Sequence, residues 1–265
     1  MPRPATGLRE EDGGVTEQRE TPPGAHVGYA GARVSYTAGE LTERALAPTP
    51  LEQFERWYAE AVAAGLPEPN ALVLATSDAV DGPSGRTVLL KQADARGFVF
   101  YTNHGSRKAR QITVGDGRVA LVFPWHQLQR QVCVRGVAER VPVEEARAYF
   151  TSRPWASRIG AWASHQSEPL VDRDALERRY AELAVRWPDR GTPDDVPLPE
   201  HWGGYLVRAR EVEFWQGRPS RLHDRLAFVV DPDPTANPDP TADVGPPRTA
   251  ALDDAASWHI VRRQP

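Results

Sequence analysis

Apolar and polar residues alternate with a period of two through much of the chain between residues 71 and 140. Each run is separated from the next by a short, mostly turn-like connection, and the runs are residues 71–76, 86–91, 98–102, 118–123 and 129–140. A parallel sheet would need a crossover of a dozen or more residues at every step, and such crossovers are missing. The pattern therefore predicts an antiparallel meander, and five or six strands at this spacing predict closure into a barrel.

Two of these runs are predicted to form one β-hairpin, and further strands follow near the C-terminus. Residues 87–90 and 98–101 are the predicted hairpin strands, with Gly97 at the exit of the turn. The later predicted strands are residues 205–207, 211–216, 226–230 and 258–261.

Helical periodicity predicts four helices around the strands. The first has Thr49 as N-cap, Pro50 at its first position and Glu52 completing a capping box, and it ends at Gly65. The other three are residues 107–114, 143–150 and 172–184. The predicted fold class is therefore α+β, mainly β with flanking helices.

Composition divides the chain into an arm and one domain. Residues 1–31 mix Gly, Pro, Glu and Arg with almost no large apolar side chains, which predicts a disordered arm. Residues 32–265 are predicted to form a single domain. Residues 231–257, rich in Pro, Asp and Ala, are predicted to be a flexible insertion within it.

Charge and cysteine content exclude several classes of function. With 32 Lys+Arg against 36 Asp+Glu, the net charge of −4 gives no reason to expect nucleic acid or an anionic membrane as partner. The single cysteine, Cys133, excludes an internal disulfide and a multi-cysteine zinc site, and the seven histidines show no zinc spacing. No apolar stretch of membrane-spanning length and no signal-peptide core is present, so a cytoplasmic protein without a metal is predicted.

Two groups of cations are candidates for anion binding. Arg86, Lys91 and the Arg107–Lys108 pair surround the polar loop 102–106, whose backbone N–H groups could face an anion. Tyr149 and Arg153 share one face of a helix that Pro154 ends, and Ser157 follows. Solvated surface charges, and an arginine favoured by the helix dipole, are the alternative interpretations that these residues leave open.

Two further groups could contact a ring. Gln131 shares one strand face with Cys133, where its amide could hydrogen-bond a heteroaromatic ring. In an extended strand Arg221, His223 and Arg225 would point to one side and Leu222 to the core. The chain lacks the G-x-G-x-x-G, Walker, H-E-x-x-H and G-x-S-x-G motifs, which suggests that a cofactor carries out the difficult step.

In combination, the motifs resemble those of the pyridoxamine 5′-phosphate oxidases. They are R-T-V-L-L-K, F-V-F-Y-T-N-x-G-S-R-K, F-P-W-H-x-L-x-R-Q-V, Y-F-x-S-R-P-x-x-S-x-I-G-A-W-x-S-x-Q-S, W-G-G-Y, F-W-Q-G and R-L-H-D-R, in that order. The resemblance implies an antiparallel, Greek-key-like split β-barrel that binds flavin mononucleotide (FMN) at the interface of a homodimer.

The resemblance also implies roles for individual residues. The implied FMN contacts are Arg86, Thr87, Val88, Leu89, Leu90, Lys91, Tyr101, Thr102, Arg107, Lys108, Gln131, Gln166, Ser167, Trp215 and Arg225. The implied substrate contacts are Arg33, Tyr36, Lys91, Tyr149, Arg153, Ser157, Arg221, Leu222 and His223. Of these, Arg221 and His223 would be catalytic, holding the substrate ring against the flavin.

The implied reaction is the oxidation of pyridoxamine or pyridoxine 5′-phosphate to pyridoxal 5′-phosphate. Oxygen would be the acceptor, giving hydrogen peroxide, and the amine substrate would also release ammonia. Two alternatives keep the fold: an oxidase of another cyclic substrate such as a phenazine precursor, and a non-catalytic module that binds flavin or pyridoxal phosphate. Lys91, Tyr149, Arg153 and Ser157 argue against the first alternative, because a non-phosphorylated substrate needs no second phosphate clamp. The second alternative predicts that no peroxide forms when the protein is mixed with pyridoxamine 5′-phosphate in air.

Overall fold

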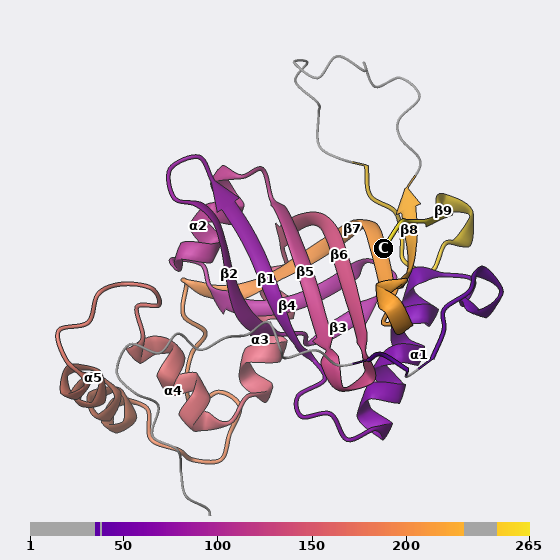
Figure 1. Ribbon diagram of the computed structural model, residues 1–265. Coiled ribbons are helices and arrows are strands. Elements are labelled where there is room, and N and C mark those ends of the chain that lie inside the picture. The colour runs from indigo at the N-terminus through magenta and orange to yellow at the C-terminus, as the bar shows by residue number, and fades with distance from the viewer. Residues whose placement is uncertain (1–34, 38, 231–247) are drawn as a thin grey trace, which may run out of the picture. The chain divides into compact units, whose positions relative to one another are not determined.

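The strands of the described residues form one antiparallel sheet. The computed structural model describes residues 35–37, 39–230 and 248–265 (Figure 1). The strands are β1 (Ala71–Asp78), β2 (Gly82–Leu89), β3 (Gln92–Asp94), β4 (Gly97–Asn103), β5 (Arg118–Trp125), β6 (Arg130–Arg140), β7 (Trp202–Gln216), β8 (Asp224–Val230) and β9 (Trp258–Arg262). The predicted arm, Arg33 and residues 231–247 of the predicted insertion lie outside the described residues.

The sheet divides into two parts at the long strand β7, which pairs with three other strands of the described residues. The strand order is β2-β1-β5-β6-β7-β4-β3, with β8 and β9 branching from β7. One edge of β7 pairs with β6, whereas its other edge pairs first with β4, at residues 202–207, and then with β8, at residues 211–216. The two strands predicted over this stretch are therefore one, and the register shift between Arg135 and Gly136 leaves Arg210 as an extra, bulged residue.

The predicted hairpin of residues 87–90 with 98–101 is wrong. β2 pairs with β1, so that Val88 lies opposite Leu72, and β4 pairs with β3. A single backbone hydrogen bond, from Lys91 N to Val99 O at 2.8 Å, joins the end of β2 to β4. Alternation within a strand reports its buried face but not its partner, so the pattern alone could not decide between these pairings.

Gly97 does lie at the exit of a turn, between β3 and β4. It opposes Asp94 and has a positive φ of 147°. A Cβ atom at this position would lie 2.1 Å from the carbonyl oxygen of Val207, so β4 and β7 could not approach as closely with any other residue there.

Helix α1 (Pro50–Ala63) supplies aromatic side chains to the core, as predicted. Thr49 Oγ1 accepts the Glu52 N–H at 3.2 Å, which satisfies one of the helix's unpaired amides. Phe54 packs edge-on against Phe98 and Phe123, with both pairs of ring centroids 5.0 Å apart. These rings join one apolar cluster inside the sheet, whose burial stabilises the fold.

The described residues form four further α-helices. They are α2 (Arg107–Val114), α3 (Val143–Ser152), α4 (Trp155–Ala163) and α5 (Arg173–Arg186), and Figure 1 shows α3, α4 and α5 grouped together, away from α1. The sequence analysis did not predict α4 as a helix. Pro154 ends α3 and also begins α4, because its carbonyl accepts the N–H groups of Ser157 and Arg158.

The residues after the undescribed gap are anchored to the barrel. Leu252 is fully buried, its N–H donates to Ala95 O at 2.8 Å, and its carbonyl accepts the Leu51 N–H at 3.1 Å. This segment, residues 248–257, belongs to the insertion that the sequence predicts to be flexible. The division of the chain into an arm and one domain stays a prediction. No helix in the described part of the chain has the length and hydropathy needed to span a membrane.

Candidate active site

A cavity of about 980 Å³ opens between the end of β2, strand β4, the start of α2 and the α3–α4 pair. The residues predicted as contacts that line it are Arg86, Thr87, Val88, Leu89, Lys91, Tyr101, Thr102, Arg107, Lys108, Tyr149, Arg153, Ser157, Gln166 and Ser167. Among the described residues of its lining, five are Lys or Arg and none is Asp or Glu. An anionic ligand is what such a cavity would bind most favourably.

Three of the cations gather at the start of α2. Arg86 donates to Leu74 O at 3.1 Å and to the hydroxyls of Thr76 and Ser84 at 2.6 and 2.5 Å, all neutral acceptors. Arg107 pairs with Asp81 at 3.3 Å, across an exposed contact. The first turn of a helix also presents backbone N–H groups that lack acceptors within the helix, which adds to the positive potential.

Lys108 is the most buried of the three. Lys108 is only 7% exposed. Its ammonium donates to Gln166 Oε1 at 2.7 Å and to the Thr102 and Ser106 hydroxyls. Burial, and then the charge of Arg86, lower the pKa of Lys108 to about 8. A phosphate placed here would compensate a charge that has no carboxylate partner among the described residues.

The other two cations lie beside aromatic rings. Lys91 Nζ is 5.9 Å from the centre of the Tyr149 ring, and the Arg153 guanidinium lies 4.9 Å from that of Trp202. Arg153 Nη1 is buried and has no hydrogen-bond partner within the described part of the chain, and burial lowers the pKa of this guanidinium. Such an orphaned donor is costly unless a ligand accepts from it. Ser157 lines the same cavity, so the predicted clamp of Lys91, Tyr149, Arg153 and Ser157 is brought together.

The sequence did not predict the following lining residues as contacts: Asn103, Pro154, Gly160, Ala161, Ser164 and Trp202. Four of them belong to α4 or flank it, the helix that was not predicted. Trp202 stacks on Tyr101 with ring centroids 5.4 Å apart and planes 9° from parallel, and Tyr101 stacks on Tyr149 at 4.1 Å. The W-G-G-Y motif marked Trp202, but only the folded sheet places it under Arg153.

A second group of predicted residues lies elsewhere. The rings of Tyr36, Trp215 and His223 are in mutual contact, with centroids 4.7 to 5.9 Å apart. The extended strand predicted for residues 221–225 is wrong at its start: residues Pro219–Arg221 form a 3₁₀ turn in which Ser220 and Arg221 have positive φ values of 57° and 62°. Leu222, predicted to face the core, is 69% exposed, because this turn rotates it outward.

The remaining predicted contacts have other surroundings. Arg225 is paired with the buried Glu213 at 2.8 Å, and Gln131 lies opposite Trp215 on the neighbouring strand. Leu90 is buried in the core and does not line the cavity. Cys133 is half-buried next to Gln131, and burial raises the pKa of its thiol to about 11, which keeps it unreactive.

Strand β7 separates the two groups. Trp202, at its first residue, lines the cavity, and Trp215, near its last, belongs to the aromatic group with His223. At about 3.3 Å per residue, these two positions are roughly 40 Å apart along the strand. One chain therefore presents the cavity and the Arg221–His223 turn as two separate surfaces.

The chain matches two family models that together span most of the described structure. Residues 58–186 match the model of pyridoxamine 5′-phosphate oxidase, and residues 202–265 match that of the pyridoxine 5′-phosphate oxidase C-terminal dimerisation region. The pyridoxine/pyridoxamine 5′-phosphate oxidase of Kineococcus radiotolerans is 58% identical over 89% of this chain and 98% of its own length. That of Rubrobacter xylanophilus is 55% identical over 78% of this chain and 94% of its own.

Solved structures agree on the fold. PhzG from Burkholderia lata, crystallised with tetrahydrophenazine-1-carboxylic acid, is 29% identical, has a TM-score of 0.69 and covers 85% of this chain and 98% of its own. An FMN-binding protein from Nostoc punctiforme related to pyridoxamine 5′-phosphate oxidase is 16% identical, has a TM-score of 0.57 and covers 80% of this chain and 97% of its own. The latter likeness concerns the fold alone. Both support the split β-barrel.

Proposed function

The chain belongs to the pyridoxamine 5′-phosphate oxidase family, and we propose that its cavity and its Arg221–His223 turn are the two halves of that family's active site. The protein is an FMN-dependent oxidoreductase that converts pyridoxine and pyridoxamine 5′-phosphates to pyridoxal 5′-phosphate. The observation that carries the assignment of the site is the cavity with five cations and no carboxylate in its described lining.

The residues present fit FMN. Arg86, Arg107 and Lys108 offer the phosphate three cations, of which only Arg107 has a carboxylate partner among the described residues. Thr102 and Gln166 add a hydroxyl and an amide, two neutral groups that can form hydrogen bonds with the edge of a flavin ring. We therefore assign these five residues to the cofactor.

A second group of cavity residues fits a second phosphate. Lys91, Tyr149, Arg153 and Ser157 supply two charges, a phenol and a hydroxyl, and the orphaned Nη1 of Arg153 still needs an acceptor. This group supports a phosphorylated substrate over a phenazine precursor, which carries no phosphate for it to bind. Each charge-assisted hydrogen bond to the phosphate would stabilise the complex by about 1.5–3 kcal/mol.

The site is completed by a second subunit. The C-terminal dimerisation region supports a homodimer. Because β7 keeps Trp215 and His223 far from the cavity of their own chain, we infer that they reach the partner's cavity, which places FMN at the interface together with Gln131 and Arg225.

Each group of residues has a distinct share in the reaction. When bound, FMN would supply the redox chemistry of hydride transfer, with oxygen as the proposed final acceptor. The phosphate clamp holds one end of the substrate, and Arg221 and His223 hold its ring, so that the reaction becomes effectively unimolecular. The rings of Tyr101, Tyr149 and Trp202 stack on one another beside Lys91 and Arg153. Nothing in this scheme needs a membrane or nucleic acid, in keeping with a cytoplasmic enzyme.

The test is oxidation of pyridoxine 5′-phosphate by the purified protein, loaded with FMN, in air-saturated buffer. We expect pyridoxal 5′-phosphate and hydrogen peroxide in equal amounts, and far slower oxidation of unphosphorylated pyridoxine. Tight FMN binding without any product would identify a binding module instead. Equal rates with and without the phosphate would mean that the clamp is wrongly assigned.

A further inference from the structure

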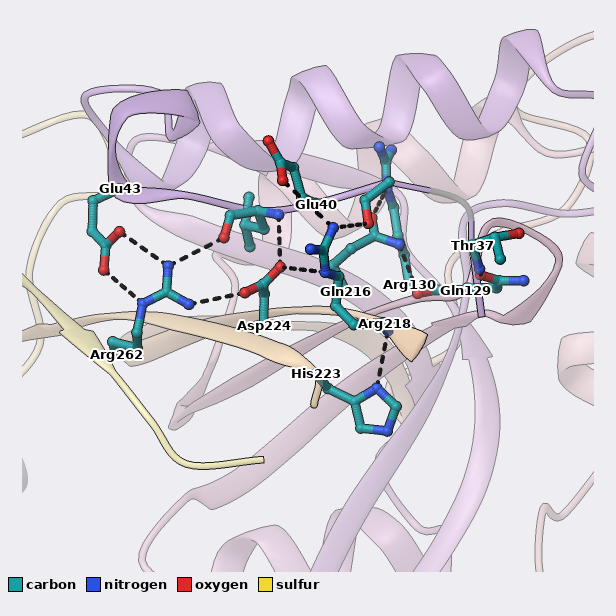
Figure 2. A network of polar contacts seen from close by, with 12 residues as sticks. Thr37, Glu40, Glu43, Gln129, Arg130, Gln216, Arg218, His223, Asp224 and Arg262 are labelled. Atoms are coloured by element: carbon teal, nitrogen blue, oxygen red, sulfur yellow. Dashed lines mark hydrogen bonds and ion pairs between the residues drawn. The ribbon is translucent and has the colours of Figure 1, made fainter. Parts of the chain in front are cut away.

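The segment before α1 is tied down across the aromatic group. We call residues 36–37 and 39–46 the strap. Side chains from other parts of the chain hold its backbone: Gln129 Oε1 accepts the Thr37 N–H at 2.8 Å, Arg218 donates to Gly39 O at 3.1 Å, and Asp224 Oδ2 accepts the Leu41 N–H at 3.0 Å. Figure 2 shows these contacts running along the strap toward Glu43.

Asp224 is the centre of this network. Besides the strap amide, its carboxylate meets Arg262 of β9 at 2.9 Å and Arg218 at 3.5 Å (Figure 2). Arg262 in turn donates to Leu41 O at 3.2 Å and to both carboxylate oxygens of Glu43, at 2.7 and 3.0 Å. One carboxylate therefore connects the strap, the C-terminal strand and the turn that precedes β8.

Arg218 connects the same network to the active-site turn. Its backbone N–H donates to His223 Nδ1 at 3.1 Å, while its side chain holds Gly39 and Asp224. Because Nδ1 accepts this hydrogen bond, a neutral His223 carries its proton on Nε2, on the opposite side of the ring. Arg218 and Asp224 therefore hold the two ends of the loop that carries Arg221. Within this loop Arg221 has a left-handed backbone conformation.

The strap also delivers a ring to the same place. Tyr36 packs against the backbone of Gly217, where a Cβ atom would lie 2.9 Å from the tyrosine ring, and its ring centroid is 5.6 Å from that of His223. Seating of the strap and orientation of His223 therefore depend on the same few contacts.

We propose that Asp224 is a positioning residue, and that with Arg218, Arg262 and Glu43 it forms a latch that couples the seating of the strap to the geometry of the Arg221–His223 turn. Asp224 acts through these neighbours and belongs to no part of the cavity lining. The consequence for the reaction rests on the proposed function, whereas the coupling itself is a property of the fold. It follows that disturbing the latch at its strap end changes the turn, and the reverse.

The sharpest test changes the strap end and observes the turn. In Glu43→Gln the Arg262 contact loses its charge while the size of the side chain is kept. We expect amide exchange, measured by mass spectrometry on the full FMN-loaded protein, to accelerate in the peptide covering 218–224 as well as in the strap. In Asp224→Asn, both peptides should exchange about tenfold faster, because the Leu41 and Arg218 contacts weaken together.

Glu177→Gln is the matched control. Its Arg173 contact is also 2.7 Å, but it lies on the exposed face of α5, far from the strap in sequence. This variant should leave both peptides unchanged. Glu43 is solvent-exposed, so its variant will fold even if Asp224→Asn does not.

Kinetics give the second readout. For Asp224→Asn we expect kcat to fall by about tenfold with FMN occupancy unchanged, since the substrate ring is held less well, and Asp224→Glu should recover part of the loss. If Glu43→Gln loosens the strap while the 218–224 peptide keeps its parental exchange rate, the coupling does not exist. That result would not contradict the proposed oxidase activity. Conversely, faster exchange of both peptides in a protein without oxidase activity would support the coupling and contradict the proposed function.

Discussion

At the scale of single residues, the cations of the cavity differ in how far the protein already compensates their charge. Among the described residues, Arg107 has a carboxylate partner, Arg86 has only neutral acceptors, and Arg153 has a buried donor with no acceptor. The groups with the least compensation have the most to gain from a bound phosphate. They are therefore the residues whose replacement should be most informative.

Arg153 and Arg221 are predicted to have different kinetic effects. Arg153 would bind the substrate phosphate equally in the ground and transition states, so Arg153→Ala should raise KM by about a hundredfold, corresponding to a lost contact of about 3 kcal/mol. Arg221→Ala should lower kcat as well, because the ring position decides the hydride step. Steady-state kinetics with pyridoxine 5′-phosphate and pyridoxine measure both. If Arg153→Ala preferred the phosphorylated form as strongly as the parent, the clamp would be misplaced.

Lys108 predicts a pH dependence of FMN binding. Its pKa is lowered to about 8, mainly by burial, and the FMN phosphate needs the charged form. Affinity for FMN should therefore be constant below pH 8 and fall by up to about tenfold per pH unit above it. Fluorescence titration of the apoprotein with FMN from pH 7 to 10 measures this. A Lys108→Gln variant should bind more weakly and show no such decline.

Lys108 has the opposite effect on the stability of the apoprotein, because it makes the free energy of unfolding increase with pH. Between pH 8 and the ordinary lysine value of 10.5, the unfolded chain binds more protons at Lys108 than the folded one. Stability contributed by this residue therefore rises with pH across that window, since the buried charge is lost. The difference in unfolding free energy between the parent and Lys108→Gln isolates it. We expect the free energy of unfolding of the parent, minus that of the variant, to increase between pH 8 and 10.5. A decrease over this range would contradict the assigned burial of Lys108.

At the scale of elements, the close approach of β6 and β7 determines how the barrel divides. The register shift at Gly136 lets β7 bend, so that its first part pairs with β4 and its second with β8. A Cβ atom on Gly136 would lie 2.1 Å from Arg208 O, which is a backbone atom and cannot move alone. The bulge and the glycine are one structural feature.

Gly136→Ala is predicted to destabilise the protein. The clash would force the strands apart and should cost about 2–4 kcal/mol in the free energy of unfolding, measured by urea denaturation of the apoprotein. Gly160→Ala is the matched control, because a Cβ atom there has no neighbour within 4 Å and the site is helical. It should be neutral or stabilising by up to about 1 kcal/mol. Equal effects of the two changes would argue against the close approach.

At the scale of the whole molecule, the two ends of β7 carry two separate groups of proposed site residues. The cavity holds the cations, and the Arg221–His223 turn holds the groups proposed to face the substrate ring. If the site is shared, each subunit lacks one half without its partner. Two variants damaged in different halves should then repair each other.

Mixing variants tests this arrangement. Arg107→Ala/Lys108→Ala damages the cavity, and Arg221→Ala/His223→Ala damages the turn. When the two proteins are refolded together in equal amounts, half of the dimers contain both chains and one intact site, so about a quarter of the parental activity should return. Each variant alone, refolded in the same way, should stay inactive. Failure of the mixture, despite hybrid dimers demonstrated by mass spectrometry, would place both halves in one chain.

The sequence by itself determined most of the elements and the chemical type of the site. Helix α1, its Thr49 cap and helix α2 were predictable because capping and amphipathic spacing act within a few residues. The family could also be identified, because its residues occur in short motifs, and the same motifs contain the residues of the proposed phosphate clamp. What escaped prediction at this level was α4, because Pro154 both ends one helix and begins the next.

Strand partners and the separation of the cavity from the Arg221–His223 turn were decided only by the tertiary structure. The pairing of β2 with β1, the continuous β7 and the left-handed turn at Ser220 and Arg221 all depend on contacts between residues distant in sequence. The latch of Glu43, Asp224 and Arg262 likewise joins positions near both ends of the chain. Local patterns show which face of an element is buried, but packing alone selects its neighbours.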